Sequence, residues 1–177
     1  VPFAGSYDVG ATAPTYTTLK SFFDAVNANV LNGDITVNII DNTIETATAQ
    51  LNALAEEGIG GYSVTIQPSG GGARLITGNL STAAIIKTVG VNKFTINGLN
   101  SGGNALTVSN TNATAPLAIH IASSGTTVVS NINISNITTA TGLNTGTTVS
   151  SMGVSISDQA SGGVTAGYFN NVTIQNN

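Results

Sequence analysis

The feature that most limits the fold is a strand-like word that recurs along the C-terminal half of the chain. It reads FTINGLN from Phe94 to Asn100, VVSNINISN from Val128 to Asn136 and YFNNVTIQN from Tyr168 to Asn176. Apolar residues alternate there with small polar ones, which is the two-residue period of a β-strand with one buried face. The polar positions carry Asn, Ser, Thr and Gln rather than charged side chains. We therefore expect a stack of similar strands.

The recurrence extends over longer segments. When AIIKTVGVNKFTINGL is placed above AIHIASSGTTVVSNINI, Ile85 matches Ile119 and Leu99 matches Ile132. A third copy reaches Val172 and holds its extra length in the loop DQASGGVTAG. Short strands separated by Gly, Ser and Asn turns at this period are typical of a solenoid rather than of a β-sandwich.

We predict an all-β fold, a right-handed parallel β-helix of about four to five coils with a short N-terminal capping α-helix. In such a stack, inward positions need Ile, Val or Leu in every coil. Outward Thr, Ser and Asn can hydrogen bond along the stack, whereas stacked like charges would repel. Gly98, Asn131 and Asn171 align in one column, which predicts a left-handed backbone corner repeated in successive coils.

The N-terminal segment has a helical period instead. The word TLKSFFDAVNANVLNG predicts an amphipathic helix from Thr18 to Val30 that closes the N-terminal end, with its stop at Asn32-Gly33. A strand over residues 35–40 follows, and a second short helix is predicted over Ala49–Glu57. We divide the chain into an N-terminal segment with its capping helix (residues 1–33) and the coils (residues 34–177), which form one domain.

Composition limits the function classes. Only 7% of the residues are charged, and the net charge is −4; an average globular protein has roughly 25% charged residues. Four basic residues cannot neutralise many phosphates, which argues against nucleic-acid binding. Cysteine is absent, so no disulfide framework or thiolate metal site is expected. No apolar run reaches the roughly 18–20 residues of a membrane span.

Side chains that could carry chemistry are few in the coils. Seven of the eight carboxylates lie in the N-terminal third, and the eighth, Asp158, is interpreted as a solvated turn residue. His120 is the one histidine, and we predict it on the exposed outer face of a strand, in the column of Lys87. We expect no enzyme activity and no catalytic, cofactor-binding or metal-binding residues. Tyr168, Phe169 and Asp158 are the weak candidates for ligand contact.

The opening of the chain resembles a known family. The word YTTLKSFFDAVNANVLNGDITVNIIDNTIET looks like the N-terminal cap of the pectin-lyase-like superfamily, in which an aromatic-Thr-Leu/Ile word starts a short helix. The following strand there ends in a turn of the Gly-Thr-Tyr kind, which residues 41–45 (DNTIE) replace here. The word GSYDVGATAPTYTTLKSFFDAVN is also similar to β-helical modules of large secreted surface proteins of the Bacteroidota type, which are commonly exported by type IX secretion and act as adhesins or surface-layer components.

This resemblance implies a non-catalytic structural or adhesive module of a protein that is secreted or lies at the cell surface. The alternative is a carbohydrate-binding or polysaccharide-cleaving β-helix of the pectin-lyase-like superfamily. Because nothing like the N-terminal helix follows Val172, we expect as partners further coils or domains of the same polypeptide, or self-association at an open C-terminal end. Surface glycans are further candidate partners.

Overall fold

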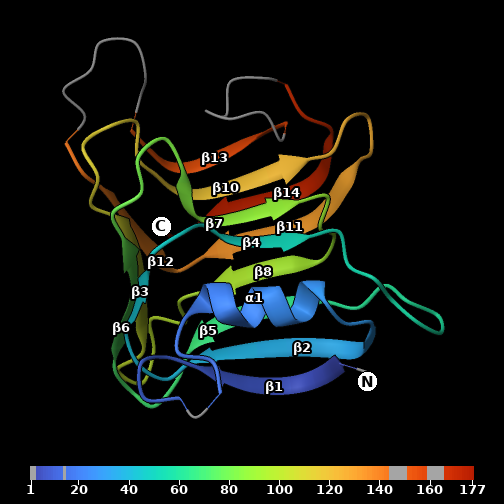
Figure 1. Ribbon diagram of the computed structural model, residues 1–177, viewed down its shortest axis with the longest axis horizontal. Helices are drawn as coiled ribbons and strands as arrows, with labels where there is room; N and C mark the ends of the chain where they lie inside the picture. Colours follow the sequence, from blue (N-terminus) through green and yellow to red (C-terminus); the bar gives the residue numbers. More distant parts are fainter. Residues whose placement is uncertain (1–2, 14, 144–150, 159–165) are drawn as a thin grey trace.

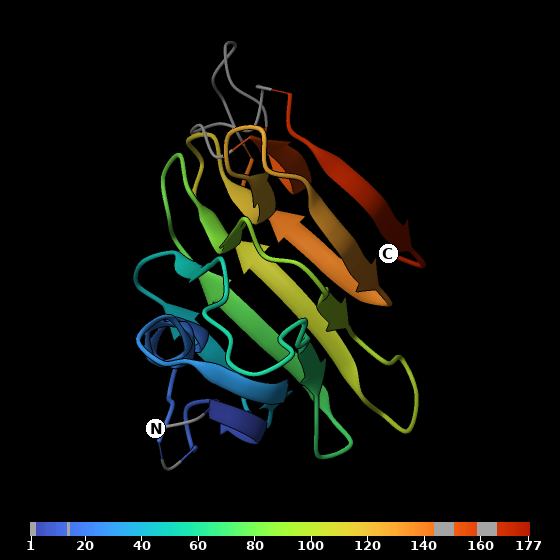
Figure 2. The ribbon, with the colours of Figure 1, turned by 90° about the vertical axis from the view of Figure 1, so that its right-hand side faces the viewer.

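The chain is wound into a solenoid of about four turns whose strands form three parallel sheets (Figure 1). The computed structural model describes residues 3–13, 15–143, 151–158 and 166–177. We name the sheets A (β1-β2-β5-β8-β11-β14), B (β3-β6-β9-β12) and C (β4-β7-β10-β13). The coils stack from the N-terminal strand to the C-terminal strand, as Figure 2 shows. The predicted parallel β-helix is confirmed.

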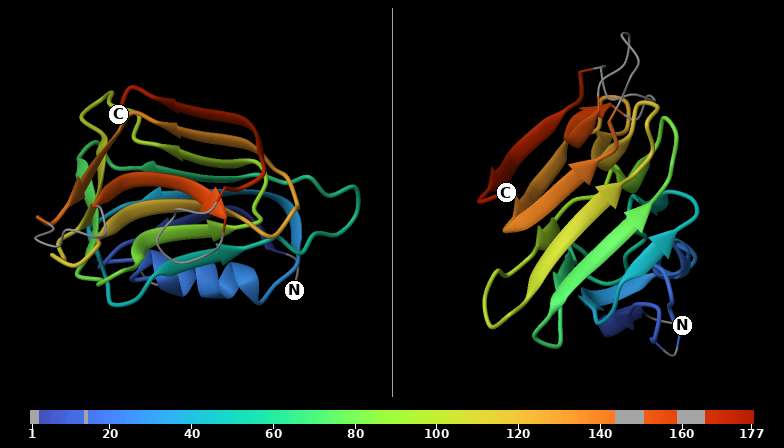
Figure 3. Two further views of the ribbon diagram at one scale, coloured as in Figure 1. Left: turned by 90° about the horizontal axis from the view of Figure 1, so that it is seen from above. Right: turned by 90° about the vertical axis from the view of Figure 1, so that its left-hand side faces the viewer.

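Each coil passes through sheets A, B and C in turn. Sheet A contains β1 (Phe3–Val9), β2 (Leu31–Ile39), β5 (Val64–Pro68), β8 (Phe94–Asn97), β11 (Val129–Ser135) and β14 (Phe169–Gln175). Sheet B contains β3 (Thr43–Glu45), β6 (Ala73–Gly78), β9 (Ala105–Asn110) and β12 (Ile137–Thr141). Sheet C contains β4 (Ala49–Asn52), β7 (Ala84–Val89), β10 (Leu117–Ser123) and β13 (Met152–Asp158). Seen from above, the chain turns counterclockwise as it rises, so the coil is right-handed (Figure 3).

The core is a stack of apolar side chains in register. One column of sheet A contains Ile35, Val64, Phe94, Ile132 and Val172. The first four of these are at most 1% exposed. Each coil therefore buries a branched or aromatic side chain against the same position of the next coil, which contributes about 1.5–3 kcal/mol for each fully buried side chain.

The repeat was correctly identified from the sequence, but its register was wrong. Ile119 pairs with Ile86, one residue beyond the predicted partner. Ile132 pairs with Phe94 instead of Leu99. The connection from β10 to β11 is longer than the one from β7 to β8, so an alignment without gaps slips between them. The register is set by the residues that face the core. A slip of one residue would turn every side chain of a strand to the wrong face.

The predicted corner column is correct for two of its three members. Asn131 and Asn171 have left-handed backbones, with φ of 60° and 55°, and the Nδ2 of Asn171 donates to the Oδ1 of Asn131 at 2.6 Å. Lys93, with φ of 52°, occupies the position that was assigned to Gly98. Gly98 lies at another corner, where a Cβ atom would collide with the carbonyl oxygen of Asn136. Close approach of two backbones therefore requires this glycine.

The capping helix α1 spans Leu19–Asn27 and ends earlier than predicted. Thr18 is its N-cap and forms a capping box with Ser21. The buried stripe stops at Val26, whereas Val30 is 42% exposed, so no apolar contact extends the helix to Val30. Strand β2 begins only a few residues after the helix and includes the predicted stop at residues 32–33.

Helix α1 lies beside β4, where a further strand of sheet C would lie (Figure 1). The Asn27 side chain replaces part of the strand ladder: its Nδ2 donates to the Gln50 carbonyl at 2.8 Å, and its Oδ1 accepts from the Asn52 amide at 2.9 Å. The Glu45 carboxylate of β3 accepts from the amides of Leu19 and Lys20 at 2.9 and 3.0 Å. The N-terminal edge of sheet C and the free amides of the helix thus both have partners.

The helix predicted over Ala49–Glu57 is wrong, because the chain forms β4 there and then a loop. Ala49 and Leu51 are buried while Gln50 and Asn52 are exposed, which is a strand pattern. A segment of four residues is too short for its sequence to distinguish the helical period from the strand period. Pairing with β7 makes it a strand. Strand β1, which the sequence analysis did not predict, lies within residues 1–33 and pairs in parallel with β2.

Candidate functional site

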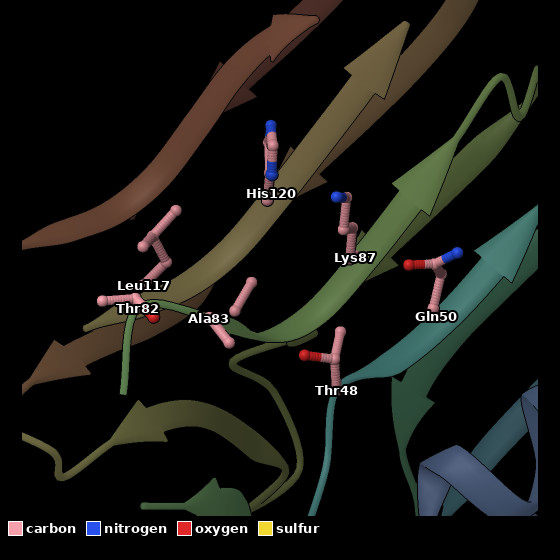
Figure 4. A pocket seen from close by; sticks show the side chains of 8 residues that line it. Thr48, Gln50, Thr82, Ala83, Lys87, Leu117 and His120 are labelled. Carbon is pink, nitrogen blue, oxygen red and sulfur yellow. The ribbon is translucent and has the colours of Figure 1, made fainter. Parts of the chain in front are cut away.

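The outward face of sheet C carries a small pocket around His120 (Figure 4). The register places one residue from each of four coils in a single column: Gln50 of β4, Lys87 of β7, His120 of β10 and Ser155 of β13. The pocket has a volume of about 140 Å³ and is lined by Thr48, Gln50, Thr82, Ala83, Ala84, Lys87, Leu117 and His120. Its polar groups are hydroxyls, an amide, an ammonium and an imidazole.

His120 is buried, which corrects the prediction of an exposed strand residue. It does stand in the column of Lys87, as expected, but it is only 3% exposed. Every residue of β10 is buried, on the outward as well as the inward face. The alternation of the strand correctly indicated the outward direction of the side chain. It could not indicate that this residue is buried, because burial depends on contacts with residues far away in the sequence.

The imidazole of His120 contacts a serine hydroxyl. Its Nε2 lies 2.7 Å from the Oγ of Ser157, and that hydroxyl also donates to the carbonyl of Asp158 at 3.1 Å. A hydroxyl has one proton, so while that proton is donated to the Asp158 carbonyl the Ser157 oxygen accepts from Nε2–H of His120. The pair links β10 to β13.

Burial of the imidazole lowers the pKa of His120, and the nearby Lys87 ammonium lowers it further. Both effects favour the neutral ring, because a low dielectric and a like charge each disfavour the imidazolium. A hydrogen bond to the backbone of Asp158 opposes this shift. His120 is therefore neutral around pH 7, which agrees with the hydrogen-bond roles above.

The three weak candidates for ligand contact have different positions. Asp158 is the last residue of β13 and pairs with Ser123, so it is a half-buried strand residue rather than the predicted solvated turn residue. The amide of Tyr168 donates to the Oγ of the same Ser123 at 3.3 Å, and the Tyr168 side chain is 50% exposed. Phe169 begins β14, pairs with Val129 and packs against the core. The structure thus brings Asp158 and Tyr168 close to one serine, whereas Phe169 contributes to core packing. Most of the loop between Asp158 and Tyr168 lies outside the described residues.

Three carboxylates in the N-terminal third of the chain accept hydrogen bonds from backbone amides. Glu45 is 1% exposed and holds the start of α1. Asp34 accepts from the amide and the hydroxyl of Ser63 at 2.8 and 2.9 Å, which holds the pKa of Asp34 below its usual value. Glu56 accepts from the amides of Gly61 and Tyr62, each at 2.8 Å. These carboxylates stabilise loops and helix termini.

Across residues 3–13, 15–143, 151–158 and 166–177, no group of three or more His, Asp or Glu side chains could hold a metal ion. In the same ranges, no helix is long and apolar enough to cross a membrane.

Sequence reasoning missed the contact between His120 and Ser157. The two residues lie on neighbouring coils, and Ser157 carried no local signal that distinguishes it from the many other serines. With the correct register, in which Ser155 pairs with His120, a serine two residues further along β13 would have been a candidate partner.

Comparison with protein-family models, with curated proteins and with solved structures finds no match to this chain.

Proposed function

We propose that the chain is a non-catalytic structural module, a rigid spacer with adhesive faces, in a protein that is secreted and displayed at the cell surface. The observation that carries this proposal is the set of side-chain hydrogen bonds that join one coil to the next at the corners of the solenoid. A stack cross-linked in this way resists shearing between coils, as a spacer must.

The inter-coil bonds are made mostly by neutral amides. Asn171 donates to Asn131 at 2.6 Å and Asn112 donates to Asn79 at 2.6 Å. Buried Asn110 bonds to two residues of the preceding coil: its Oδ1 accepts from the amide of Leu80, and its Nδ2 donates to the carbonyls of Leu80 and Ala83. Each bond contributes about 0.5–1.5 kcal/mol net, so together they couple neighbouring coils.

The outward face of sheet A is a regular polar surface. One column consists of Ser6, Thr36, Thr65, Thr95, Asn133 and Thr173. Rows repeat at the strand spacing of about 4.8 Å. Hydroxyl and amide groups at a fixed repeat can make many weak contacts with a partner, and the low charge makes such contacts insensitive to salt. This surface supports an adhesive role.

The buried chemical groups also support a structural role. His120 is held neutral against Ser157, and Glu45 holds the capping helix. The resemblance of the opening words to secreted β-helical modules supports location at the cell surface, with type IX export as the corresponding route.

The location can be tested on cells that express the gene naturally. Antibodies against the chain should label intact cells, and external protease should remove that label without lysis. A chain found only in the cytoplasmic fraction would contradict the proposal.

The non-catalytic role is tested separately. The purified chain, incubated with pectin, other uronate polymers and neutral polysaccharides, should release no reducing ends. Depolymerisation that disappears in the Asp158→Ala variant would show that the chain is an enzyme.

A further inference from the structure

A second, larger groove lies at the corner where the chain passes from sheet C to sheet A. Three successive coils form it: the loop after β4, the turn after β7 and the segment that leads into β11. It has a volume of about 500 Å³, and its lining includes Leu54, Glu56, Tyr62, Asn92, Lys93 and Asn131. The loop after β4 projects to the right of the solenoid in Figure 1 and forms one wall of the groove.

This wall is held in place by its own polar contacts. The Glu56 carboxylate accepts from the amides of Gly61 and Tyr62, each at 2.8 Å. The Lys93 ammonium, from the next coil, donates to the Gly61 carbonyl at 2.5 Å. The Tyr62 hydroxyl donates to the Glu57 carbonyl at 3.1 Å, which orients the ring. The groove is therefore largely formed before any ligand arrives.

Two asparagines present amide donors to the groove. The Oδ1 of Asn92 accepts from the Ser130 amide at 2.7 Å, and the Oδ1 of Asn131 accepts from Asn171 at 2.6 Å. In the described part of the chain, no protein group accepts a hydrogen bond from the Nδ2 atom of either residue. Since the acceptor end of each amide is already held by the protein, the orientation of both donors is set.

The rest of the lining combines apolar and hydroxyl groups. Leu54 and Tyr62 are half-buried and pack against the core, so they form the apolar part of this wall. Thr127 and Ser130 add hydroxyls. The one carboxylate, Glu56, and the one ammonium, Lys93, balance each other in formal charge. The complementary ligand is uncharged, with hydroxyl oxygens along its edge and an apolar face that packs on an aromatic ring.

We propose that this groove binds a neutral glycan chain, with its ring face on Tyr62 and its hydroxyls at the Nδ2 atoms of Asn92 and Asn131. Sugar rings have both of the required surfaces. The three contributing coils span about 10 Å, from two steps of the strand spacing, so the ligand is an oligosaccharide rather than a single ring. This inference goes beyond the proposed function, because the adhesive role proposed for the outward face of sheet A needs no defined binding groove.

The test is a titration of the whole isotope-labelled chain followed by NMR. The probes are neutral oligosaccharides built from glucose, mannose, galactose or N-acetylglucosamine, with trigalacturonate as the acidic comparison. We expect at least one neutral probe to shift the side-chain NH₂ signals of Asn92 and Asn131 and to saturate. Saturable shifts with trigalacturonate alone, or no saturable shift of these two signals with any probe, would overturn the proposal.

A matched pair of variants separates binding from stability. Asn92→Asp keeps the Oδ1 acceptor for the Ser130 amide and removes the Nδ2 donor. Asn42→Asp is the control, because the Oδ1 of Asn42 accepts from the Leu75 amide at 2.9 Å, also in the next coil but away from the groove. We expect Asn92→Asp to weaken binding about tenfold, as for one lost hydrogen bond, and Asn42→Asp to leave it unchanged. Equal affinities for both variants would contradict the assignment.

The outcome is independent of the proposed function. Glycan binding by a chain confined to the cytoplasm would contradict the surface location and leave the groove assigned. A surface-displayed chain that binds none of the probes would support the surface location and overturn the assignment of the groove.

Discussion

The Nε2 atom of His120 lies 2.7 Å from the Oγ of Ser157, and the two residues come from neighbouring coils on the outward face of sheet C. His120 is thus a buried titratable group in a solenoid whose other outward groups are mostly neutral amides and hydroxyls. It links coil stacking to pH, because burial and the nearby Lys87 ammonium lower the pKa of His120 and so disfavour the charged ring in the folded chain.

The first prediction concerns pH. The pKa of His120 is near 6.5 in the unfolded chain and lower in the folded one. Its contribution to stability is therefore complete above about pH 6.5 and is lost as pH falls from there toward the folded pKa, because the unfolded chain binds the proton first. Urea denaturation between about pH 8 and about pH 5 should show this loss. His120→Gln should show less of it, and an identical pH dependence in both proteins would contradict the prediction.

The second prediction concerns truncation of the same side chain. His120→Ala should cost about 1–3 kcal/mol, since it removes a buried hydrogen-bonded group and leaves Ser157 with one partner fewer. Asp158→Ala should cost less than His120→Ala, because it retains the strand backbone and the carbonyl that accepts from Ser157. Equilibrium unfolding of both variants measures the difference, and equal costs would count against the structural role of His120.

The third prediction concerns two neighbouring inward columns of sheet A, one with Ile132 and one with Ile96. Ile132→Ala and Ile96→Ala should each cost about 2–5 kcal/mol, because both side chains are at most 1% exposed and their removal leaves a cavity between coils. Thr95, the outward neighbour of Ile96 in β8, is the control, and Thr95→Ala should cost less than about 1 kcal/mol. Similar losses at positions 95 and 96 in thermal unfolding would mean that the inward assignment is wrong.

The fourth prediction concerns the capping helix. Glu45→Ala should cost about 1–2 kcal/mol and loosen the N-terminal turn of α1, because the buried carboxylate accepts from the amides of Leu19 and Lys20. Hydrogen exchange of these two amides should accelerate. Asp24→Ala, which removes an exposed i,i+4 pair with Lys20, should change stability by only about 0.5 kcal/mol. Unchanged exchange at both amides in Glu45→Ala would contradict the capping role.

The fifth prediction concerns the left-handed corner. Asn131 has φ of 60°, a conformation that Gly and Asn tolerate and a β-branched residue does not. Asn131→Val should therefore destabilise more than Asn131→Gly, although both remove the bond from Asn171. The difference should reach about 1–2 kcal/mol in urea denaturation. A valine variant as stable as the glycine variant would show that this corner carries no strain.

The alternation of apolar and small polar residues in words such as FTIN and NINI determined the strands, their inward faces and the solenoid class, because stacked coils need the same inward chemistry in each turn. The apolar stripe from Leu19 to Val26 likewise determined the capping helix. These features depend on local periodicity, which the sequence contains in full. The left-handed corner at Asn131 and Asn171 was also predictable from the sequence, because few residue types tolerate a left-handed backbone.

Only the tertiary structure decided the register, the state of Ala49–Asn52 and the burial of His120. The register depends on loop lengths that differ from coil to coil, so Ile132 pairs with Phe94. Residues 49–52 are a strand because β7 offers a partner. His120 is 3% exposed and contacts Ser157 of the neighbouring coil. Each of these outcomes depends on contacts between residues far apart in the chain, and such contacts leave no signal in the local pattern.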